Sequence, residues 1–381
     1  MKGLIAYRDR KRWLWTLSVL WPLMPLSGIG IYMLSGSEWA FAVPLLLAYV
    51  VSPVLDWLIG ADPNNPPEEI VPQLEQDHYY RILTWLTVPL HFVVLALVVW
   101  FIAIHSLGPL AVIALAFTAG IYSGLCINTA HELGHKKSAF ERLLARLALA
   151  VPAYGHFGVE HNRGHHRLVA TPEDPASARM GESLYRFMLR EIPGAARRAW
   201  RLETGRLHAS GHGFFNRRNE ILQSYAVTLV FQGGLVFFGG WTVLPFLLLH
   251  NFWAWFQLTC ANYVEHYGLL REKGADGNYL PCRPRHSWNC NYVFSNLVMF
   301  HLERHSDHHA YPARRYQALR NHDGIPQLPT GYFGMYLAAY VPWLWYRVMD
   351  QRLLRLPHIR GDFAKINIDP ERSRNIRRQV T

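Results

Sequence analysis

Long apolar stretches constrain the fold of this 381-residue chain more than any other feature. Four of them cover residues 13–34, 39–59, 82–105 and 107–129, and each is long enough for one helix to cross the ~30 Å hydrocarbon layer of a bilayer. A further apolar block, 221–263, is about twice as long as one crossing needs. Gly239 and Gly240 divide it into two crossings, 224–238 and 242–263. Because a helix satisfies its own backbone hydrogen bonds in lipid, the sequence predicts an all-α integral membrane protein with six transmembrane helices.

The segments between the apolar stretches divide the chain into four parts. Residues 1–129 form an N-terminal arm and four helices, 130–220 a polar histidine-rich region, 221–263 two further helices, and 264–381 a second histidine-rich region. The apolar segment 331–349 is expected to be a helix in the membrane interface or on the polar domain, ahead of a basic tail. The mean hydropathy of +0.02 is low for a multi-pass protein, so a large polar part must lie outside the bilayer.

The net charge of +11 does not indicate nucleic-acid binding, because the basic residues flank the apolar stretches and crowd region 130–220. Lys and Arg gather on the cytoplasmic side of membrane proteins. Four crossings precede this region, so the N-terminus, with Arg8, Arg10, Lys11 and Arg12, is expected in the cytoplasm as well. Six crossings then bring both histidine-rich regions to that same side.

Nine histidines form four clusters within these regions. Residues four apart on a helix lie about 40° apart around its axis, so His131 and His135 should share one face, as should His161 and His165. A neighbouring residue lies about 100° away, so the doubled histidines can serve two different metal ions. Imidazole suits iron, copper, zinc and nickel, and therefore does not identify the metal. The predicted ligands are His131, His135, His161, His165, His166, His266, His305, His308 and His309.

Acidic residues stand beside every cluster. Two metal ions held only by neutral imidazoles carry a large positive charge, which a buried site must compensate. We expect these carboxylates to form a second shell that accepts the outer ring N–H groups of the ligands. They are Glu132, Glu160, Asp174, Glu265 and Asp307. His91, inside the third apolar stretch, is expected to have a structural role.

The four cluster motifs together resemble one family. HELGH (131–135), HNRGHH (161–166) running into Thr171–Pro175, NYVEHYG (262–268) and RHSDHH (304–309) occur in the order found in integral-membrane alkane monooxygenases. This family belongs to the histidine-box group, with acyl desaturases and xylene and carotenoid hydroxylases. The resemblance extends from the first apolar stretch to about Arg320, and NYVEHYG is specific to the alkane branch.

The resemblance implies a non-haem diiron centre, with two Fe ions and O₂ as co-substrate. It implies hydroxylation of the terminal methyl group of medium-chain n-alkanes to 1-alkanols, in the inner membrane of a bacterium. The alkane would come from the bilayer lipid through an apolar tunnel between the six helices, because a chain without polar groups can be selected only by shape.

The same resemblance implies rubredoxin as the electron donor, with rubredoxin reductase upstream. Cys126, Cys260, Cys282 and Cys290 form no C-x-x-C pair, so electrons must come from a separate protein. Lys136, Lys137 and the arginines from Arg197 to Arg218 are candidate docking residues for this acidic donor. Contact with anionic lipid headgroups explains these arginines equally well.

Other functions remain open from the motifs alone. An acyl desaturase or a xylene-type methyl hydroxylase shares the histidine boxes, although EHYG argues against the desaturase. HELGH also matches H-E-x-x-H of zinc metalloproteases, but a membrane protease leaves seven cluster histidines unexplained. A metal transporter or storage protein is disfavoured, because the histidines gather outside the membrane instead of lining a path through it.

Overall fold

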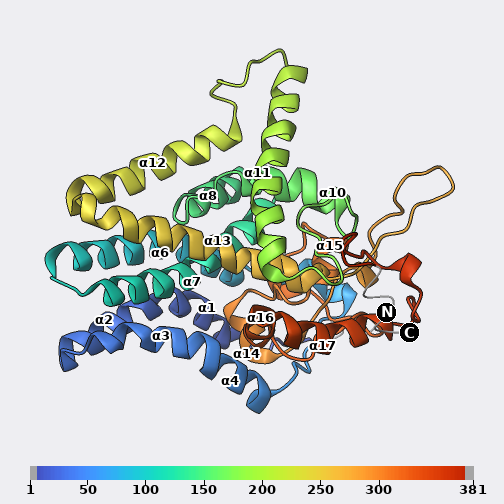
Figure 1. The fold of residues 1–381 in the computed structure, drawn as a ribbon, viewed down its shortest axis with the longest axis horizontal. Coiled ribbons are helices and arrows are strands. Elements are labelled where there is room, and N and C mark those ends of the chain that lie inside the picture. The colour runs from blue at the N-terminus through green and yellow to red at the C-terminus, as the bar shows by residue number, and fades with distance from the viewer. Residues whose placement is uncertain (1–6, 374–381) are drawn as a thin grey trace.

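The computed structural model describes residues 7–373, and within this range the secondary structure is helical with a few isolated β-bridges. Six helical segments of the described residues are long and apolar enough to cross a membrane. They are Arg12–Ser35, Glu38–Ile59, His78–Ile104, Pro109–Gly134, Glu220–Gly239 and Trp241–His266. Figure 1 shows their helices lying roughly side by side in one half of the molecule. The predicted all-α fold and the number of membrane helices are confirmed.

Prolines interrupt the first two membrane segments. The first consists of η1 (Arg12–Thr16), α1 (Leu17–Leu20), η2 (Trp21–Leu23) and α2 (Met24–Ser35). The second consists of η3 (Glu38–Ala42), α3 (Val43–Leu46), the π-helix η4 (Leu47–Val51) and α4 (Ser52–Ile59). Proline lacks the N–H that an α-helix needs in its interior. Pro22, Pro25, Pro44 and Pro53 each lie at the first or second position of a new piece, where that loss is tolerated.

The remaining membrane helices are continuous, apart from a short 3₁₀ turn before the last. They are α6 (His78–Ile104), α7 (Pro109–Gly134), α12 (Glu220–Gly239) and α13 (Leu244–His266). The apolar parts of α7 and α13 were predicted to end at Thr129 and Tyr263, with His131 and His266 on extensions of the same helices, and the structure shows these extensions. Both helices continue for about one turn, and this extra turn carries His131 in α7 and His266 in α13.

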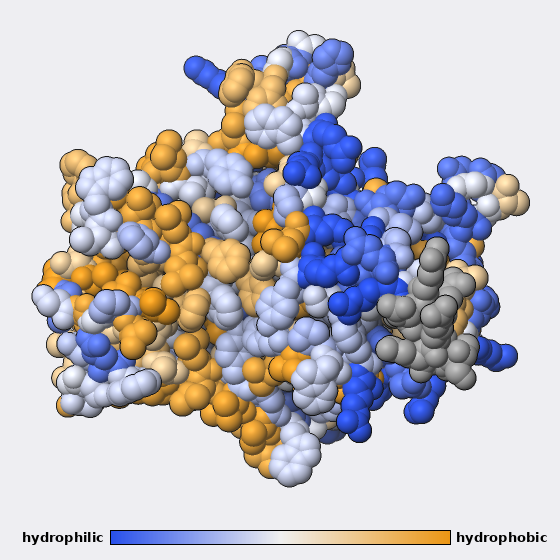
Figure 2. All heavy atoms as spheres, in the orientation of Figure 1, coloured by the Kyte–Doolittle hydropathy of each residue, from blue (hydrophilic) through white to orange (hydrophobic). Residues whose placement is uncertain are grey.

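The polar half of the molecule is built on these two helix ends. It includes α8 (Ala139–Ala150), α9 (Phe157–Glu160), α10 (His166–Leu168), α11 (Leu184–Ala209), α14 (Val293–Val298) and α15 (His305–Ala310). Helix α8 packs against α7 and α12, and α11 packs against α13 while running across the membrane helices (Figure 1). Figure 2 shows the resulting division of the surface, with apolar residues over the membrane helices and polar residues over the other half.

The apolar segment near the C-terminus forms two helices instead of the one expected. Helix α16 (Tyr332–Tyr340) ends before Pro342, which begins α17 (Pro342–Leu354). Tyr332 and Trp345 are buried against the protein, and the ring centroid of Trp345 lies 4.9 Å from that of Tyr263 in α13. Trp343 is 66% exposed. The segment is therefore packed on the protein by one face, and it is not among the candidate membrane spans of the described residues.

Candidate metal centre

The structure brings all nine predicted ligand histidines together in two adjacent groups. The first group contains His131, His135, His161, His166 and His308, and the second contains His165, His266, His305 and His309. Within each group, one nitrogen from every ring lies within 4.8 Å of the others. The two members of each adjacent pair, His165 with His166 and His308 with His309, belong to different groups. Each of these short helical segments therefore contributes to both groups.

A π-helical turn, η6 (His161–His165), produces this division in the HNRGHH motif. In an α-helix His161 and His165 would share a face and His166 would point well away. A π-turn closes hydrogen bonds between residues five apart, which places His166 nearly above His161. The structure accordingly groups His161 with His166, at 3.0 Å between their Nε2 atoms, and sends His165 to the second group. The predicted pairing of His161 with His165 was wrong for this reason.

The spacing of the ring nitrogens fits a metal ion at each group. In the first group, His308 Nε2 lies 2.9 Å from His131 Nε2 and 3.2 Å from His166 Nε2. In the second, His309 Nε2 lies 2.9 Å from His305 Nε2 and 3.3 Å from His165 Nε2. Metal–imidazole bonds of about 2.1 Å at right angles would place neighbouring nitrogens about 3.0 Å apart.

Most of the rings are held in the neutral form that can bind a cation; His165 is the exception, because Asp174 raises its pKa despite burial. Burial, and after it the repulsion between neighbouring imidazoles, holds the pKa of His161, His305, His308 and His309 well below the usual histidine value. Metal ligation needs neutral imidazole. Nε2 of His135 is buried and has no hydrogen-bond partner among the described residues. A buried polar atom left unpaired is costly, and a bound metal would remove that cost.

The five carboxylates do not share one role. Oδ2 of Asp174 lies 2.9 Å from Nδ1 of His165, on the side of the ring away from the group, where it fixes the orientation of the ring as predicted. Glu132 is instead paired with Lys136, Glu160 with Arg198, and Asp307 with both Arg314 and His322. Their expected hydrogen bonds to ligand rings are absent among the described contacts, because charged donors form stronger hydrogen bonds than neutral rings do.

Glu265 differs from the expectation in another way. Its Oε2 lies 3.3 Å from Nε2 of His305, which is the nitrogen that faces the metal group and not the outer one. Its other oxygen accepts a hydrogen bond from the hydroxyl of Tyr332 at 3.0 Å. Glu265 therefore lies on the inner side of the second group.

Arg198, counted among the candidate docking residues, has a different role, because it is buried and cannot contact a partner protein. It is buried in α11 and donates to both Glu160 and Asp174, which links the acids behind two ligand segments. The available signal was its helical spacing, because Glu191, Ala195 and Arg198 form one buried stripe along α11.

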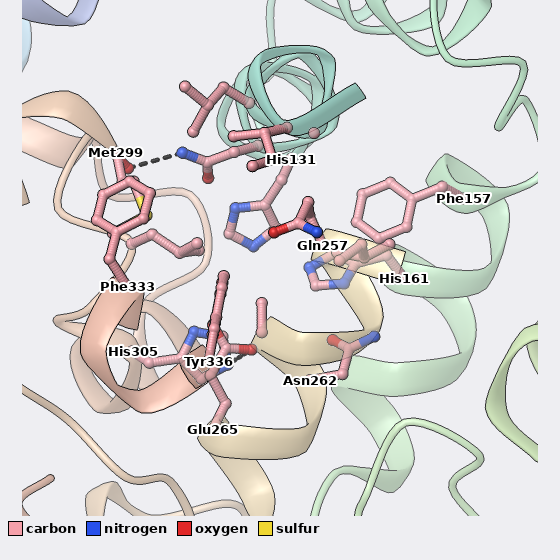
Figure 3. Close-up of a pocket in the computed structure, with 17 residues that line it drawn as sticks. His131, Phe157, His161, Gln257, Asn262, Glu265, Met299, His305, Phe333 and Tyr336 are labelled. Atoms are coloured by element: carbon pink, nitrogen blue, oxygen red, sulfur yellow. Dashed lines mark hydrogen bonds and ion pairs between the residues drawn. The ribbon is translucent and has the colours of Figure 1, made fainter. Parts of the chain in front are cut away.

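A mostly apolar cavity opens onto the histidines between α7, α13 and α16 (Figure 3). Its wall includes Ile121, Leu125, Leu258, Ala261 and Phe333, with His131, His161 and His305 at the end nearest the metal groups. The residues that line it come from α7, α13, α16 and nearby loops, and not from the first two membrane segments. The polar residues Asn128, Gln257 and Asn262 interrupt the apolar wall.

His91 in α6 is buried, and its Nε2 has no hydrogen-bond partner among the described residues.

Comparisons with known proteins agree with this geometry. A family model described as fatty acid desaturase matches residues 107–337. The chain is 52% identical to alkane 1-monooxygenase 1 of Alcanivorax borkumensis over 96% of its own length and 90% of that protein. It is 51% identical to alkane 1-monooxygenase of Pseudomonas putida over 95% of its own length and 90% of that protein. Its identity to the xylene/toluene monooxygenase hydroxylase component of Pseudomonas putida is 25%, over 64% of each chain. The histidine groups, the cavity above them and the full-length relatives lead to one conclusion: the chain belongs to the alkane 1-monooxygenase family of membrane hydroxylases.

Proposed function

We propose that this protein hydroxylates the terminal methyl group of medium-chain n-alkanes, using O₂, two iron ions and electrons from rubredoxin. We further propose that it does so in the inner membrane of a bacterium, with the N-terminus and the histidine groups facing the cytoplasm. One observation carries the proposal: an apolar cavity between two membrane helices ends at two histidine groups of suitable spacing. Alkane 1-monooxygenases at about half identity support it.

The cavity residues supply the selectivity that this reaction requires. An alkane offers no hydrogen-bonding group, so the chain must be recognised by burial of its apolar surface. Ile121, Leu125 and Leu258 provide such a surface, and Gly120 and Gly124 let α7 approach α13 closely enough to keep the space narrow. A narrow apolar space also excludes water from the reacting carbon.

The histidines would hold the iron, with His131, His135, His161, His166 and His308 at one ion and His165, His266, His305 and His309 at the other. Bound iron would activate O₂, placing one oxygen atom in the C–H bond while the other leaves as water with two electrons and two protons. Asp174 fixes the proton of His165 on Nδ1, which leaves Nε2 free as a ligand. Burial keeps water away from the other rings.

The candidate docking residues for rubredoxin differ in their exposure on the protein surface. Lys136 is buried and bonded to Glu132 and to the carbonyl oxygen of Arg314, so it cannot contact a partner. Lys137 is exposed and borders a surface groove with Tyr311, which lies two residues after His309. We infer that the acidic donor approaches this groove, because it lies beside the ligand helix α15. The exposed arginines near the end of α11 are better explained by lipid headgroups.

The test combines metal content with product analysis. His135→Ala, His166→Ala and His309→Ala should each abolish conversion of labelled octane to 1-octanol by reduced rubredoxin, while the helical content of the purified protein stays unchanged. His208→Ala, an exposed histidine outside the groups, is the matched control and should keep full activity. Wild-type protein should contain about two irons per chain. Retained hydroxylation in all three variants, or one zinc in place of iron, would rule out the proposed function.

A further inference from the structure

Glu265 stands out among the acidic residues because it faces the cavity and the metal group at the same time. It is the penultimate residue of α13, is 2% exposed, and lines the cavity together with His305 (Figure 3). The hydroxyl of Tyr332, itself fully buried in α16, donates to Oε1 and leaves Oε2 directed toward His305.

The surroundings of His305 Nε2 show what this placement requires. His309 Nε2 lies 2.9 Å away, His266 Nε2 lies 3.2 Å away, and Oε2 of Glu265 lies 3.3 Å away. A single proton on His305 can be donated to only one of these three acceptors. A cation shared by all four atoms satisfies them together, and the Glu265 oxygen lies at the same spacing as the neighbouring ring nitrogens.

The two histidine groups differ in how much negative charge is available to them. The first group has five imidazoles, and its adjacent acid, Glu132, is neutralised by Lys136. The second group has four imidazoles, with Asp174 behind His165 and Glu265 in front of His305. No basic side chain contacts Glu265 among the described residues, whereas Asp174 is paired with Arg198. The charge of Glu265 is therefore the uncompensated one.

We propose that the carboxylate of Glu265 is the anionic partner of the metal held by His165, His266, His305 and His309, and that Tyr332 positions it. The Glu265 carboxylate takes the place of a fifth imidazole, because the second group has four histidines and the first has five. Because a buried divalent cation among neutral ligands is costly, the nearest unpaired carboxylate stabilises it most. The two metal positions are then chemically inequivalent, and the second group is the more anionic one.

The inference rests on the metal centre of the proposed function, and metal retention tests it without any measurement of activity. Purified full-length protein is loaded with Fe(II) alone, and the loss of iron to an excess of chelator is followed over time. In Glu265→Gln, one of the two irons should leave roughly 10- to 100-fold faster than in wild type, the range typical for loss of a metal's outer partner. Tyr332→Phe should shift the same iron in the same direction by a smaller factor.

A second tyrosine–carboxylate pair provides the control. The hydroxyl of Tyr267 donates to Asp350 at 2.8 Å, and Asp350 contacts no histidine of either group among the described residues. Asp350→Asn and Tyr267→Phe should lose iron at the wild-type rate. If Glu265→Gln and Tyr332→Phe both keep two irons as long as wild type, the inference is overturned while the metal centre stands. If wild-type protein binds no iron, the Glu265 inference and the proposed metal centre both fail.

Discussion

Asp174 is the residue through which the polar domain acts most directly on a ligand histidine. Its carboxylate is fully buried and has three side-chain donors: His165 Nδ1 at 2.9 Å, Ser177 Oγ at 2.7 Å and Arg198 Nη2 at 2.7 Å. Arg198 offsets the cost of burying this charge. Although burial opposes ionisation, the attraction of His165 holds the pKa of Asp174 below its usual value. The residue is therefore a negative charge fixed behind one ligand.

Asp174→Asn should weaken iron binding about 10- to 100-fold, because an amide oxygen still accepts the hydrogen bond but lacks the charge that raises the basicity of His165. Equilibrium titration with Fe(II) against a competing chelator measures this change. Ser177→Ala is the control: it removes one donor to Asp174, leaves the charge, and should alter affinity by a much smaller factor. Equal affinities for Asp174→Asn and wild type would contradict the assigned role.

Glu191 makes the stability of the protein depend on pH. It is buried in α11 and accepts hydrogen bonds from Thr259 and Asn262 of α13, and burial raises its pKa to about 7. A carboxyl with a raised folded pKa keeps its proton in the folded state, so stability falls as pH rises from the unfolded value of about 4.5 to about 7. This loss amounts to roughly 3 kcal/mol.

Glu191→Gln should abolish that part of the pH dependence, because glutamine stays neutral. Thermal unfolding of the detergent-solubilised protein at pH 5 and pH 7.5 measures the difference between the variant and wild type. Glu203→Gln is a control of opposite sign: Arg206 and other donors lower the pKa of Glu203 despite its burial, so that variant should lose stability mainly at the higher pH. Parallel pH profiles for Glu191→Gln and wild type would refute the prediction.

The sequence predicts ligand residues better than it predicts their supporting contacts. The histidine spacing singled out all nine residues that the structure gathers into two groups, although the α-helical rule paired His161 with His165, which lie in different groups. The partner of an acidic residue can be close in sequence or distant from it. Glu160 is paired with Arg198 in α11, and Glu132 is paired with the neighbouring Lys136 in preference to a ring. The i,i+4 spacing of Glu132 and Lys136 is typical of a helical ion pair, whereas no spacing rule gives the pairing of Glu160 with Arg198 or of Asp174 with His165.

At the scale of elements, the contact between α7 and α13 determines the cavity. Gly120 and Gly124 lie one turn apart on α7 and face α13. A Cβ atom on Gly120 would lie 2.9 Å from the carbonyl oxygen of His250 and 2.9 Å from Cβ of Trp253. Small residues four apart allow membrane helices to pack backbone to backbone. The distance between the histidine-bearing ends of α7 and α13 therefore depends on this close approach.

Gly120→Ala should lower the stability of the protein by about 1–3 kcal/mol, the usual cost of overpacking, and should shift the ends of α7 and α13 apart. Thermal unfolding measures the first effect and iron content the second. Gly233→Ala in α12 is the matched control, because nothing lies within 4 Å of its added Cβ. A Gly120→Ala protein as stable as Gly233→Ala would show that the helices can separate without cost.

Irregular turns were the least predictable features of the fold. Apolar composition located each membrane helix, but α7 and α13 continue past their apolar parts because the histidine-rich turns pack inside the protein. The π-turn at His161–His165 has no signature in single-sequence periodicity, since α-helical spacing fits the same residues. Tertiary packing around two metal groups selects the wider turn.

The surface of the whole molecule has an apolar half over the membrane helices and a polar half (Figure 2). We propose that alkane reaches the cavity from the apolar half and that the electron donor docks on the groove at the end of α15. In the groove beside it, Tyr311 is 51% exposed and Phe140 is also 51% exposed, with Lys137 at the border. The net charge of +11 would attract an acidic donor to the protein in general, but only a basic residue near this groove would guide it to the metals.

Lys137→Glu should therefore raise the KM for reduced rubredoxin by roughly tenfold, within the range of electrostatic steering effects, and leave kcat nearly unchanged. Steady-state hydroxylation at several rubredoxin concentrations measures both values, and the wild-type KM should rise with ionic strength. Arg217→Glu, an exposed charge reversal near the end of α11, is the matched control and should have little effect. If Arg217→Glu raises the KM and Lys137→Glu does not, the donor docks at the α11 end, and electrons must reach the histidines by a route other than α15.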